Sequence, residues 1–257
     1  MSPVFKVSNY VDAYRLRAKY SRDVHELDGR RGFRRLTEFT NLQICESVHI
    51  DSVDSLVDIG CGDGCLLAVA KERGVQNAIG LSGSEEEAQR LRDAGFNVLQ
   101  AFTNSLPLPD STATVVVCNS VLLIVPRREI PASLTEIARI ARPGARIWLG
   151  EIPCIPELQS VPRHNSVSAM LRYLLHTHGL RTYLGMCRRL ISSLLRGEPF
   201  ILNSSPVTLF FSEPEEFIQM AADAGLELKR YFRHEVIDTS GKIRETEGRF
   251  NYIFVKP

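Results

Sequence analysis

The chain has 257 residues, of which 44% are hydrophobic and 24% charged, the mix of a globular protein with one large domain or two small ones. Its 31 Lys and Arg against 30 Asp and Glu leave a formal charge of +1, which argues against a dedicated nucleic-acid-binding protein. The longest uncharged apolar run, residues 113–125, is too short to span a membrane as a helix, and the first residues carry no apolar signal segment. We therefore expect a soluble, cytoplasmic protein.

The N-terminal 50 residues have a helical pattern and are the most basic stretch, with nine Lys and Arg against six Asp and Glu. Tyr10, Tyr14 and Arg17 are spaced so as to share one face of a helix. From residue 55, short apolar runs alternate with amphipathic segments. Strands are predicted at residues 55–60, 78–82, 96–101, 113–120 and 145–151, and helices at residues 65–73, from residue 84, and at residues 133–142.

This alternation is typical of a parallel sheet with helices on both faces. The run Val115–Val117, which is apolar without alternation, predicts a central strand that is buried on both sides. Ser84 with Glu87 predicts a capping box, in which each side chain bonds a free backbone N–H at the start of a helix.

Residues 152–206 interrupt the pattern and combine apolar residues with six Arg and only two Glu. We interpret this segment as a helical insertion. Ser212 with Glu215 predicts a second capping box and a helix to about Ala224. Two strand-like runs, residues 226–237 and 249–256, close the chain as an antiparallel hairpin at the edge of the sheet.

The six cysteines include no Cys-x-x-Cys pair, whereas a zinc site needs Cys or His ligands paired at short spacing. We therefore expect no metal site, and reduced thiols that are largely buried. The cysteines are at positions 45, 61, 65, 118, 154 and 187.

The most specific pattern is Asp58-Ile59-Gly60-Cys61-Gly62-Asp63-Gly64, at the junction of the first predicted strand of the sheet and its helix. Glycines at such a junction let the backbone approach a ligand closely. A dinucleotide fingerprint would need a glycine at position 65, where Cys65 stands. The carboxylate of Asp58 would repel a pyrophosphate but suits a cationic ligand with an amino group.

This loop resembles the first motif of the class I S-adenosylmethionine-dependent methyltransferases. The resemblance runs from about Leu56 to Glu151 and includes two further segments, Leu-Pro-Leu-Pro-Asp at residues 106–110 and Arg-Pro-Gly-Ala-Arg at residues 142–146. It implies an α/β fold with a doubly wound, mostly parallel seven-stranded sheet in the order 3-2-1-4-5-7-6, strand 7 being antiparallel. Residues 1–52 would form an N-terminal helical cap, and residues 53–257 a Rossmann-like domain with the helical insertion at about residues 152–206.

By the same resemblance, one set of residues would hold the methionine part of S-adenosylmethionine, and Asn119 would lie near its sulfonium. That set is Asp58, Gly60, Cys61 and Gly62. Where the family usually has an acidic residue for the ribose hydroxyls, this chain has Leu81 or Ser82. Phe102, followed by Thr103, stands where an Asp usually meets the adenine. Ser82 can still form one hydrogen bond, Phe102 can stack on the adenine, and Glu85 is a candidate to compensate for the missing carboxylate.

Methyl transfer from a sulfonium needs mainly in-line positioning, and a general base only where the acceptor is a hydroxyl or a carbon acid. Glu151, at the end of the fifth predicted strand, and His164, in the insertion, are the candidate catalytic residues. His176 and His178 are further candidates of the right type. The N-terminal segment and the insertion are expected to close together over the cofactor.

The favoured function is methyl transfer to a small-molecule acceptor, with a sugar or glycan-biosynthesis intermediate slightly ahead of an isoprenoid. A second hypothesis is a degenerate methyltransferase fold that serves as a cofactor-binding or partner subunit, because the usual ribose and adenine carboxylates are missing. A third is a peripheral membrane methyltransferase acting on a lipid or quinone-like acceptor, because the insertion is apolar and basic. The sequence does not indicate the oligomeric state.

Overall fold

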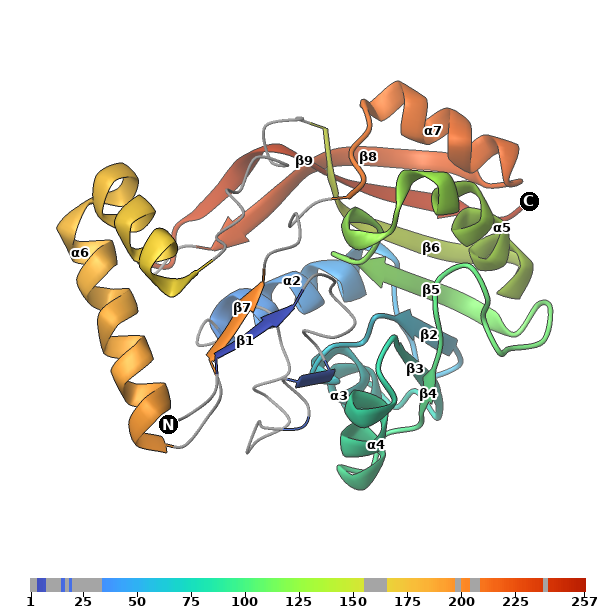
Figure 1. Cartoon of the computed structure of the whole chain (residues 1–257). Coiled ribbons are helices and arrows are strands. Elements are labelled where there is room, and N and C mark those ends of the chain that lie inside the picture. The colour runs from blue at the N-terminus through green and yellow to red at the C-terminus, as the bar shows by residue number, and fades with distance from the viewer. Residues whose placement is uncertain are drawn as a thin grey trace.

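The computed structural model describes residues 4–7, 15, 16, 19, 34–154, 166–196, 200–203, 209–237 and 240–257. Its main body is a seven-stranded sheet in the order β4-β3-β2-β5-β6-β9-β8, in which β9 is antiparallel to its two neighbours (Figure 1). This is the predicted order 3-2-1-4-5-7-6. Its strands are β2 Ser55–Ile59, β3 Asn77–Ser82, β4 Val98–Gln100, β5 Ala113–Asn119, β6 Ala141–Pro153, β8 Glu227–Ile237 and β9 Ile243–Val255.

Helices cover both faces of the sheet. One buried cluster joins α5 and α7 to the face that carries Val57, Val116 and Ile147. A second cluster joins α2 and α3 to the opposite face, which carries Val115, Val117 and the buried Trp148, while α4 packs against β3 and β4. The helices are α2 Arg34–Ser47, α3 Cys65–Glu72, α4 Glu85–Asp93, α5 Ile130–Ile140, α6 Val167–Arg196 and α7 Pro214–Asp223.

The central strand β5 has the predicted environment. Val115, Val116 and Val117 are all fully buried, and they alternate between the two clusters. An apolar run without polar alternation is stable only where both faces of the strand are covered. The closing hairpin is confirmed too, although β9 begins at Ile243, several residues before the predicted start.

Two short strands differ from the helical character expected of the N-terminal segment and the insertion. β1 (Val4–Val7) and β7 (Phe200–Asn203) pair in parallel as a separate two-stranded sheet. Their sequences, Val-Phe-Lys-Val and Phe-Ile-Leu-Asn, are rich in residues that favour strands. The insertion is helical over α6, which has a break at Gly179. Tyr10, Tyr14 and Arg17 lie outside the described residues.

The two predicted capping boxes form only in part. At α4 the Ser84 hydroxyl accepts from the Glu87 N–H at 3.3 Å, as predicted, but the Glu87 side chain turns to Ser82 instead of back to Ser84. At α7 the helix begins at Pro214, which has no N–H to cap. The Ser212 hydroxyl donates instead to the Glu216 carboxylate at 2.7 Å.

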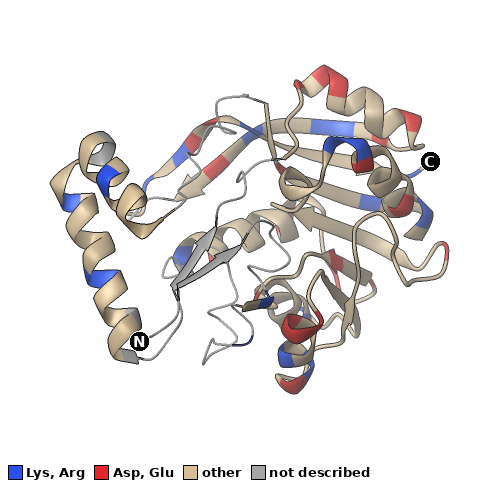
Figure 2. Ribbon diagram, viewed as in Figure 1, with Lys and Arg blue, Asp and Glu red and all other residues tan. Residues whose placement is uncertain are grey.

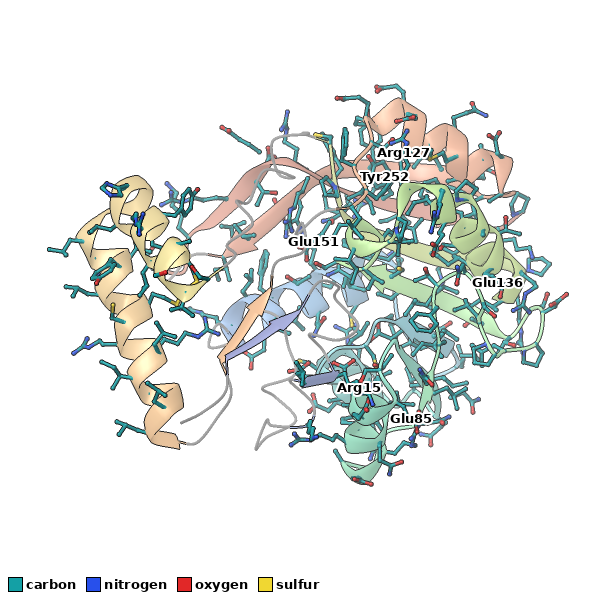
Figure 3. All side chains as sticks on the ribbon, viewed as in Figure 1. Arg15, Glu85, Arg127, Glu136, Glu151 and Tyr252 are labelled. Atoms are coloured by element: carbon teal, nitrogen blue, oxygen red, sulfur yellow. The ribbon has the colours of Figure 1, made fainter. Side chains whose placement is uncertain are left out.

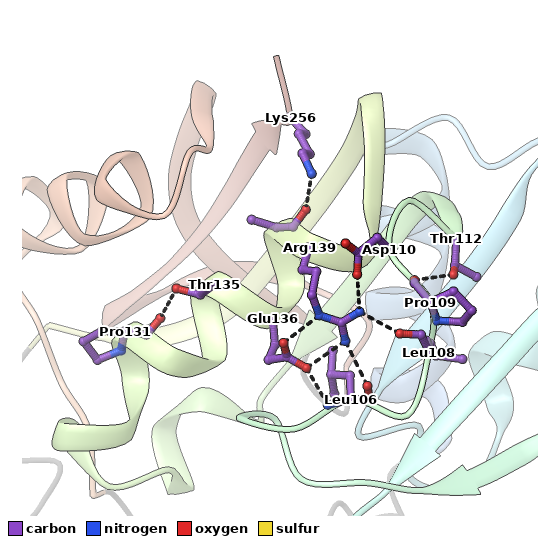
Figure 4. A network of polar contacts seen from close by, with 11 residues as sticks. Leu106, Leu108, Pro109, Asp110, Thr112, Pro131, Thr135, Glu136, Arg139 and Lys256 are labelled. Atoms are coloured by element: carbon purple, nitrogen blue, oxygen red, sulfur yellow. Dashed lines mark hydrogen bonds and ion pairs between the residues drawn. The ribbon is translucent and has the colours of Figure 1, made fainter.

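The segment at residues 106–110 is held to α5 by one guanidinium group (Figure 4). Arg139 donates to the carbonyl oxygens of Leu106 and Leu108 at 2.9 and 2.7 Å and to the Asp110 carboxylate at 2.8 Å. Glu136 accepts from Arg139 and from the Leu106 N–H, and this pairing lowers the pKa of the Glu136 carboxyl. This network fixes the loop that leads into β5.

We expect Arg139→Met to lower the free energy of unfolding by about 2–3 kcal/mol, because it leaves two partly buried carbonyls and a carboxylate without their charged donor. Urea unfolding at pH 7 measures this loss. Arg128→Met is the matched control, since Arg128 is highly exposed and its one ion pair within the described part of the chain is with its neighbour Glu129 at 3.6 Å. Equal stability of the two variants would show that the network contributes nothing beyond a surface ion pair.

Candidate functional site

The glycine loop lies at the carboxyl end of β2, with Gly60, Gly62 and Gly64 all at positive φ of 78°, 54° and 77°. The N–H groups of Gly60 and Cys61 both donate to the carbonyl of Leu81, at 2.8 and 3.1 Å. A Cβ atom on Gly60 would lie 2.2 Å from a methyl group of Val121, whereas one on Gly62 would meet nothing within 4 Å. Gly60 therefore lets the loop pack on Val121, and Gly62 presents bare backbone to open space.

Asp58 lies directly before this loop and is almost completely buried. Burial raises the pKa of its carboxyl group from the ordinary 3.8 to about 7, and the nearby charge of Asp63 adds to the effect. Within the described residues, no hydrogen bond or ion pair stabilises this carboxylate. A buried carboxylate in this position favours a cationic group as its partner.

Two further carboxylates, those of Asp63 and Glu87, lie near the same loop. Burial and the charges of Asp58 and Glu87, followed by that of Asp63, raise the pKa of the Cys61 thiol well above 9.0. Cys61 is therefore a protonated, buried thiol, and its backbone is what it offers to a ligand. The concentration of negative charge suits a ligand that carries positive charge and disfavours a phosphate.

The end of β3 differs from what the sequence alone indicates. Ser82 is buried, its hydroxyl donates to the Glu87 carboxylate, and it accepts from the Ser84 N–H at 3.1 Å. The Ser82 hydroxyl is therefore already committed to neighbouring groups. Glu87, which the sequence analysis treated only as a capping residue, places a carboxylate that is 5% exposed beside the strand end.

Glu85 faces elsewhere. It forms an exposed ion pair with Arg92 further along α4. Its neighbour Glu86 accepts from Arg15 at 2.6 Å, and this contact places Arg15 beside the first turn of the helix (Figure 3). Of the three glutamates that open α4, Glu87 alone is buried.

Phe102 follows β4 and is the exposed aromatic residue of this edge. Half of its surface is accessible, and its ring lies within 4 Å of the position that a Cβ atom on Gly83 would take. Thr103, next in sequence, bonds through its hydroxyl to Ser133 at 2.8 Å. Leu81 is buried and contributes its backbone carbonyl to the glycine loop. An exposed ring at a ligand-facing strand end is suited to stacking.

At the ends of β5 and β6, the Asn119 side chain connects two residues, Trp148 and Glu151. Its side-chain oxygen accepts from the Trp148 indole at 3.0 Å, and its amide nitrogen donates to Glu151 at 3.0 Å. A Cβ atom on Gly150 would lie 2.0 Å from the Asn119 oxygen, so only glycine fits between these side chains. Asn119 is thereby held in one orientation.

Glu151 is buried at this edge of the sheet (Figure 3), with its second carboxylate oxygen 2.9 Å from the guanidinium of Arg249. Its N–H donates to Asn251, and His234 lies 3.9 Å from the carboxylate. The sequence analysis found none of these three partners, because all come from the closing hairpin. Glu151 thus reaches the expected place, with both oxygens already bonded.

Two residues here have left-handed backbones that are unusual outside glycine. Ser120 and Glu151 both have φ of 59°, and the N–H of Ser120 donates to the carbonyl of Gly150 at 3.0 Å. Such strained conformations persist where the surrounding structure holds them, which is common at ligand sites. These conformations make the ends of β5 and β6 candidates for part of a ligand site.

Only one of the three histidine candidates has a described side chain. His164 lies outside the described residues, and His176 is exposed on α6. The described residues also contain no cluster of three or more His, Cys, Asp or Glu suited to a metal ion. The buried carboxylate of Asp58 and the open loop at Gly62 suit a cationic ligand, and Phe102 offers an exposed ring at the end of a neighbouring strand.

Comparison with known proteins agrees with this geometry. Residues 57–149 match the family model described as a methyltransferase domain. Over 95 residues the chain is 34% identical to a malonyl-[acyl-carrier protein] O-methyltransferase from Serratia marcescens. That alignment covers 37% of this chain and 36% of the relative, so the similarity spans about a third of each protein.

Solved structures share the fold over most of the chain. A putative methyltransferase of Haloferax volcanii, solved with a methyltransferase activator, matches with a TM-score of 0.63 at 17% identity, over 98% of this chain and 99% of its own. The geranyl diphosphate C-methyltransferase of Streptomyces coelicolor, solved with geranyl diphosphate and S-adenosyl-L-homocysteine, gives 0.54 at 14% identity, over 88% and 82%. At such low identity these matches establish the architecture alone.

Proposed function

Since residues 57–149 are a class I S-adenosylmethionine-dependent methyltransferase domain, we propose that the protein transfers a methyl group from S-adenosylmethionine to a small-molecule acceptor. The observation that carries this proposal is Asp58, a buried carboxylate beside an open glycine loop and without a cationic partner among the described residues. The amino group of the cofactor's methionine part would supply that partner. When bound, the cofactor supplies a methyl group that is already activated by the sulfonium.

The residues fit this cofactor in three places. Asp58 with the backbone of Gly60, Cys61 and Gly62 would hold the methionine part. Glu87 would accept from the ribose hydroxyls, with Ser82 orienting its carboxylate. Phe102 would cover the adenine, since its exposed ring lies beside Gly83 at the end of the neighbouring strand. Glu87 replaces Glu85 as the compensating group, because Glu85 is paired with Arg92 on the surface.

On the acceptor side we propose that Glu151 orients the substrate. Asn119 and Arg249 hold its two oxygens, so the side chain is a fixed carboxylate before any acceptor arrives. His164 stays a candidate base. The basic insertion favours an anionic or amphiphilic acceptor, with a sugar or glycan-biosynthesis intermediate as our first candidate. The pairing of β1 with β7 joins the N-terminal segment to the insertion, as a shared lid requires.

Calorimetry with S-adenosylhomocysteine tests the proposal directly. We expect saturable binding with one molecule per chain, and hydrogen exchange should show protection at the glycine loop and at β1 and β7. Absence of binding at millimolar ligand would refute the cofactor assignment. Binding without methyl transfer to any anionic or amphiphilic acceptor would favour the second hypothesis, a cofactor-binding subunit.

Assigning the ribose contact to Glu87 predicts different effects for substitutions of Glu87 and Glu85. We expect Glu87→Gln to weaken S-adenosylhomocysteine binding about tenfold, because a charge-assisted hydrogen bond is worth about 1.5–3 kcal/mol. Glu85→Gln should leave the affinity unchanged, since it removes only an exposed ion pair. The reverse order of effects, measured by calorimetry, would show that Glu85 contacts the ribose.

A further inference from the structure

The long helix of the insertion, α6, has an unusual charge composition. Across Val167–Arg196 it contains five arginines and neither aspartate nor glutamate. Figure 2 shows the helix with basic positions and no acidic ones, in contrast to the mixed charges of α4. A surface helix in a neutral protein normally mixes both signs, so this element favours an anionic partner.

The same helix exposes a stripe of large aliphatic side chains. Leu180, Leu184, Ile191 and Leu195 follow one another at intervals of four, seven and four residues, which places them on one face of a helix. Their exposed fractions lie between 51% and 83%, and Leu194 beside them is 55% exposed. We call these five residues the aliphatic stripe.

Arg181 and Arg188 flank the aliphatic stripe. They are seven residues apart, so they lie above one another on a single side of it, and both are exposed. Long arginine side chains in this position can reach phosphate groups while the aliphatic residues enter an apolar layer. The geometry is that of a helix lying in a membrane interface.

The body of the protein does not cover this stripe. In Figure 1, α6 stands apart from the seven-stranded sheet, and its main described neighbour is the short strand β7. Despite its length, none of the described helices, α6 included, is apolar enough to cross a bilayer. The break at Gly179 also divides it into two shorter segments. These features suit a helix lying on a membrane and exclude α6 as a spanning one.

We propose that α6 docks the protein on an anionic membrane surface, with the aliphatic stripe among the acyl chains and Arg181 and Arg188 at the lipid phosphates. Charge complementarity favours an anionic membrane over a second copy of the protein. A helix without acidic residues is attracted to anionic headgroups and repelled by another such helix. In Figure 1 the arrowhead of β5 points towards the side of the molecule where α6 lies. Docking would therefore bring the carboxyl edge of the sheet towards the membrane.

Vesicle co-sedimentation of the full chain, without cofactor, tests docking independently of the proposed methyl transfer. The probes are phosphatidylcholine vesicles and phosphatidylcholine vesicles containing about one third phosphatidylglycerol. We expect the partition coefficient to be at least about fivefold higher for the anionic vesicles and to fall with added salt. Equal binding to both compositions, or binding to neither, would overturn the proposal.

Two variants locate the contact. The triple variant Leu184→Ser, Ile191→Ser, Leu195→Ser should lower partitioning at least about tenfold, because it removes three aliphatic side chains from the interface. Arg181→Glu with Arg188→Glu should abolish the preference for anionic lipid. The matched control is Leu42→Ser with Val53→Ser, two aliphatic residues that are exposed elsewhere, and it should bind like the wild type.

Because all substituted residues are exposed, thermal melts should be unchanged, which separates docking from folding. Loss of vesicle binding in the control as severe as in the triple variant would contradict a contact specific to α6. If gel filtration instead showed a dimer that the triple variant dissociates, with no vesicle binding by either protein, the stripe would contact a second copy and the membrane proposal would be wrong.

Discussion

Asp58→Asn should weaken the binding of S-adenosylhomocysteine by about 10- to 100-fold, because it removes the charge from the partner of the ligand's amino group. The same substitution should stabilise the free protein above pH 7. The Asp58 carboxyl has a pKa of about 7 in the folded chain and about 3.8 in the unfolded chain. Ionisation of this buried, unpartnered carboxyl is unfavourable in the folded chain but not in the unfolded chain, so it lowers the free energy of unfolding.

The pH dependence follows from that difference. As pH rises from about 4 to 7 the unfolded chain ionises Asp58 first, so the free energy of unfolding of the wild type falls over this window. Asp58→Asn lacks this titration, and its advantage should grow to on the order of 2–4 kcal/mol above pH 7. Urea unfolding at pH 4.5 and pH 8 measures it. A difference independent of pH would contradict the assignment.

The affinity for S-adenosylhomocysteine should change with pH in the opposite direction to the free energy of unfolding. A cationic amino group favours ionised Asp58, so the affinity of the wild type for S-adenosylhomocysteine should increase as pH rises through 7 and then level off. Calorimetry across pH 5.5–8 should show proton release on binding near neutrality, and Asp58→Asn should lose both effects. An affinity of the wild type that falls over this range would mean that the carboxyl binds the ligand in its protonated form.

Gly62→Leu should reduce cofactor binding by about 100-fold or more, because its side chain would occupy the open space that the loop presents to a ligand. The cost to stability should be about 1–2 kcal/mol, the ordinary penalty for a side chain at positive φ. Gly95→Leu is the matched control: Gly95 has φ of 87°, also has open space around its Cβ position, and ends α4 away from the site.

Calorimetry and thermal melts of Gly62→Leu and Gly95→Leu separate the cost of backbone strain from the blocking of the ligand by the new side chain. Both variants should lose similar stability, while Gly95→Leu keeps the affinity of the wild type. Gly60 is less suitable for this test, because a Cβ there would collide with Val121 and unfold the loop as well. If Gly62→Leu bound the ligand normally, the cofactor would have to lie on another side of the loop.

Much of the sheet could be predicted from local patterns. Runs such as Val115–Val117, which are apolar on both faces, have few stable placements outside a covered parallel sheet, and the glycine loop then fixes the ligand edge. The strand pair β1 and β7 could not be predicted this way. Each strand has only four residues, and its partner is far away in the sequence, since Val4 pairs with Phe200.

The site was predicted in outline but not in its side-chain partners. Their places near the carboxyl ends of parallel strands bring Asp58, Asn119 and Glu151 to one edge of the sheet. The pairing of Ser82 with Glu87 depends on which way a helix-opening glutamate turns, and the capping pattern predicted the other direction. Arg249 binds Glu151 through the bulged register of β6 and β9, which no spacing in the sequence encodes.

The small sheet of β1 and β7 has a consequence for the order in which the chain assembles. Val4 is opposite Phe200, so β1 can pair only after the long stretch of chain between the two strands has been synthesised. Closing so long a loop for four residue pairs is entropically costly, and an isolated two-stranded sheet is marginally stable. We therefore expect this pair to form late and to open before the seven-stranded sheet does.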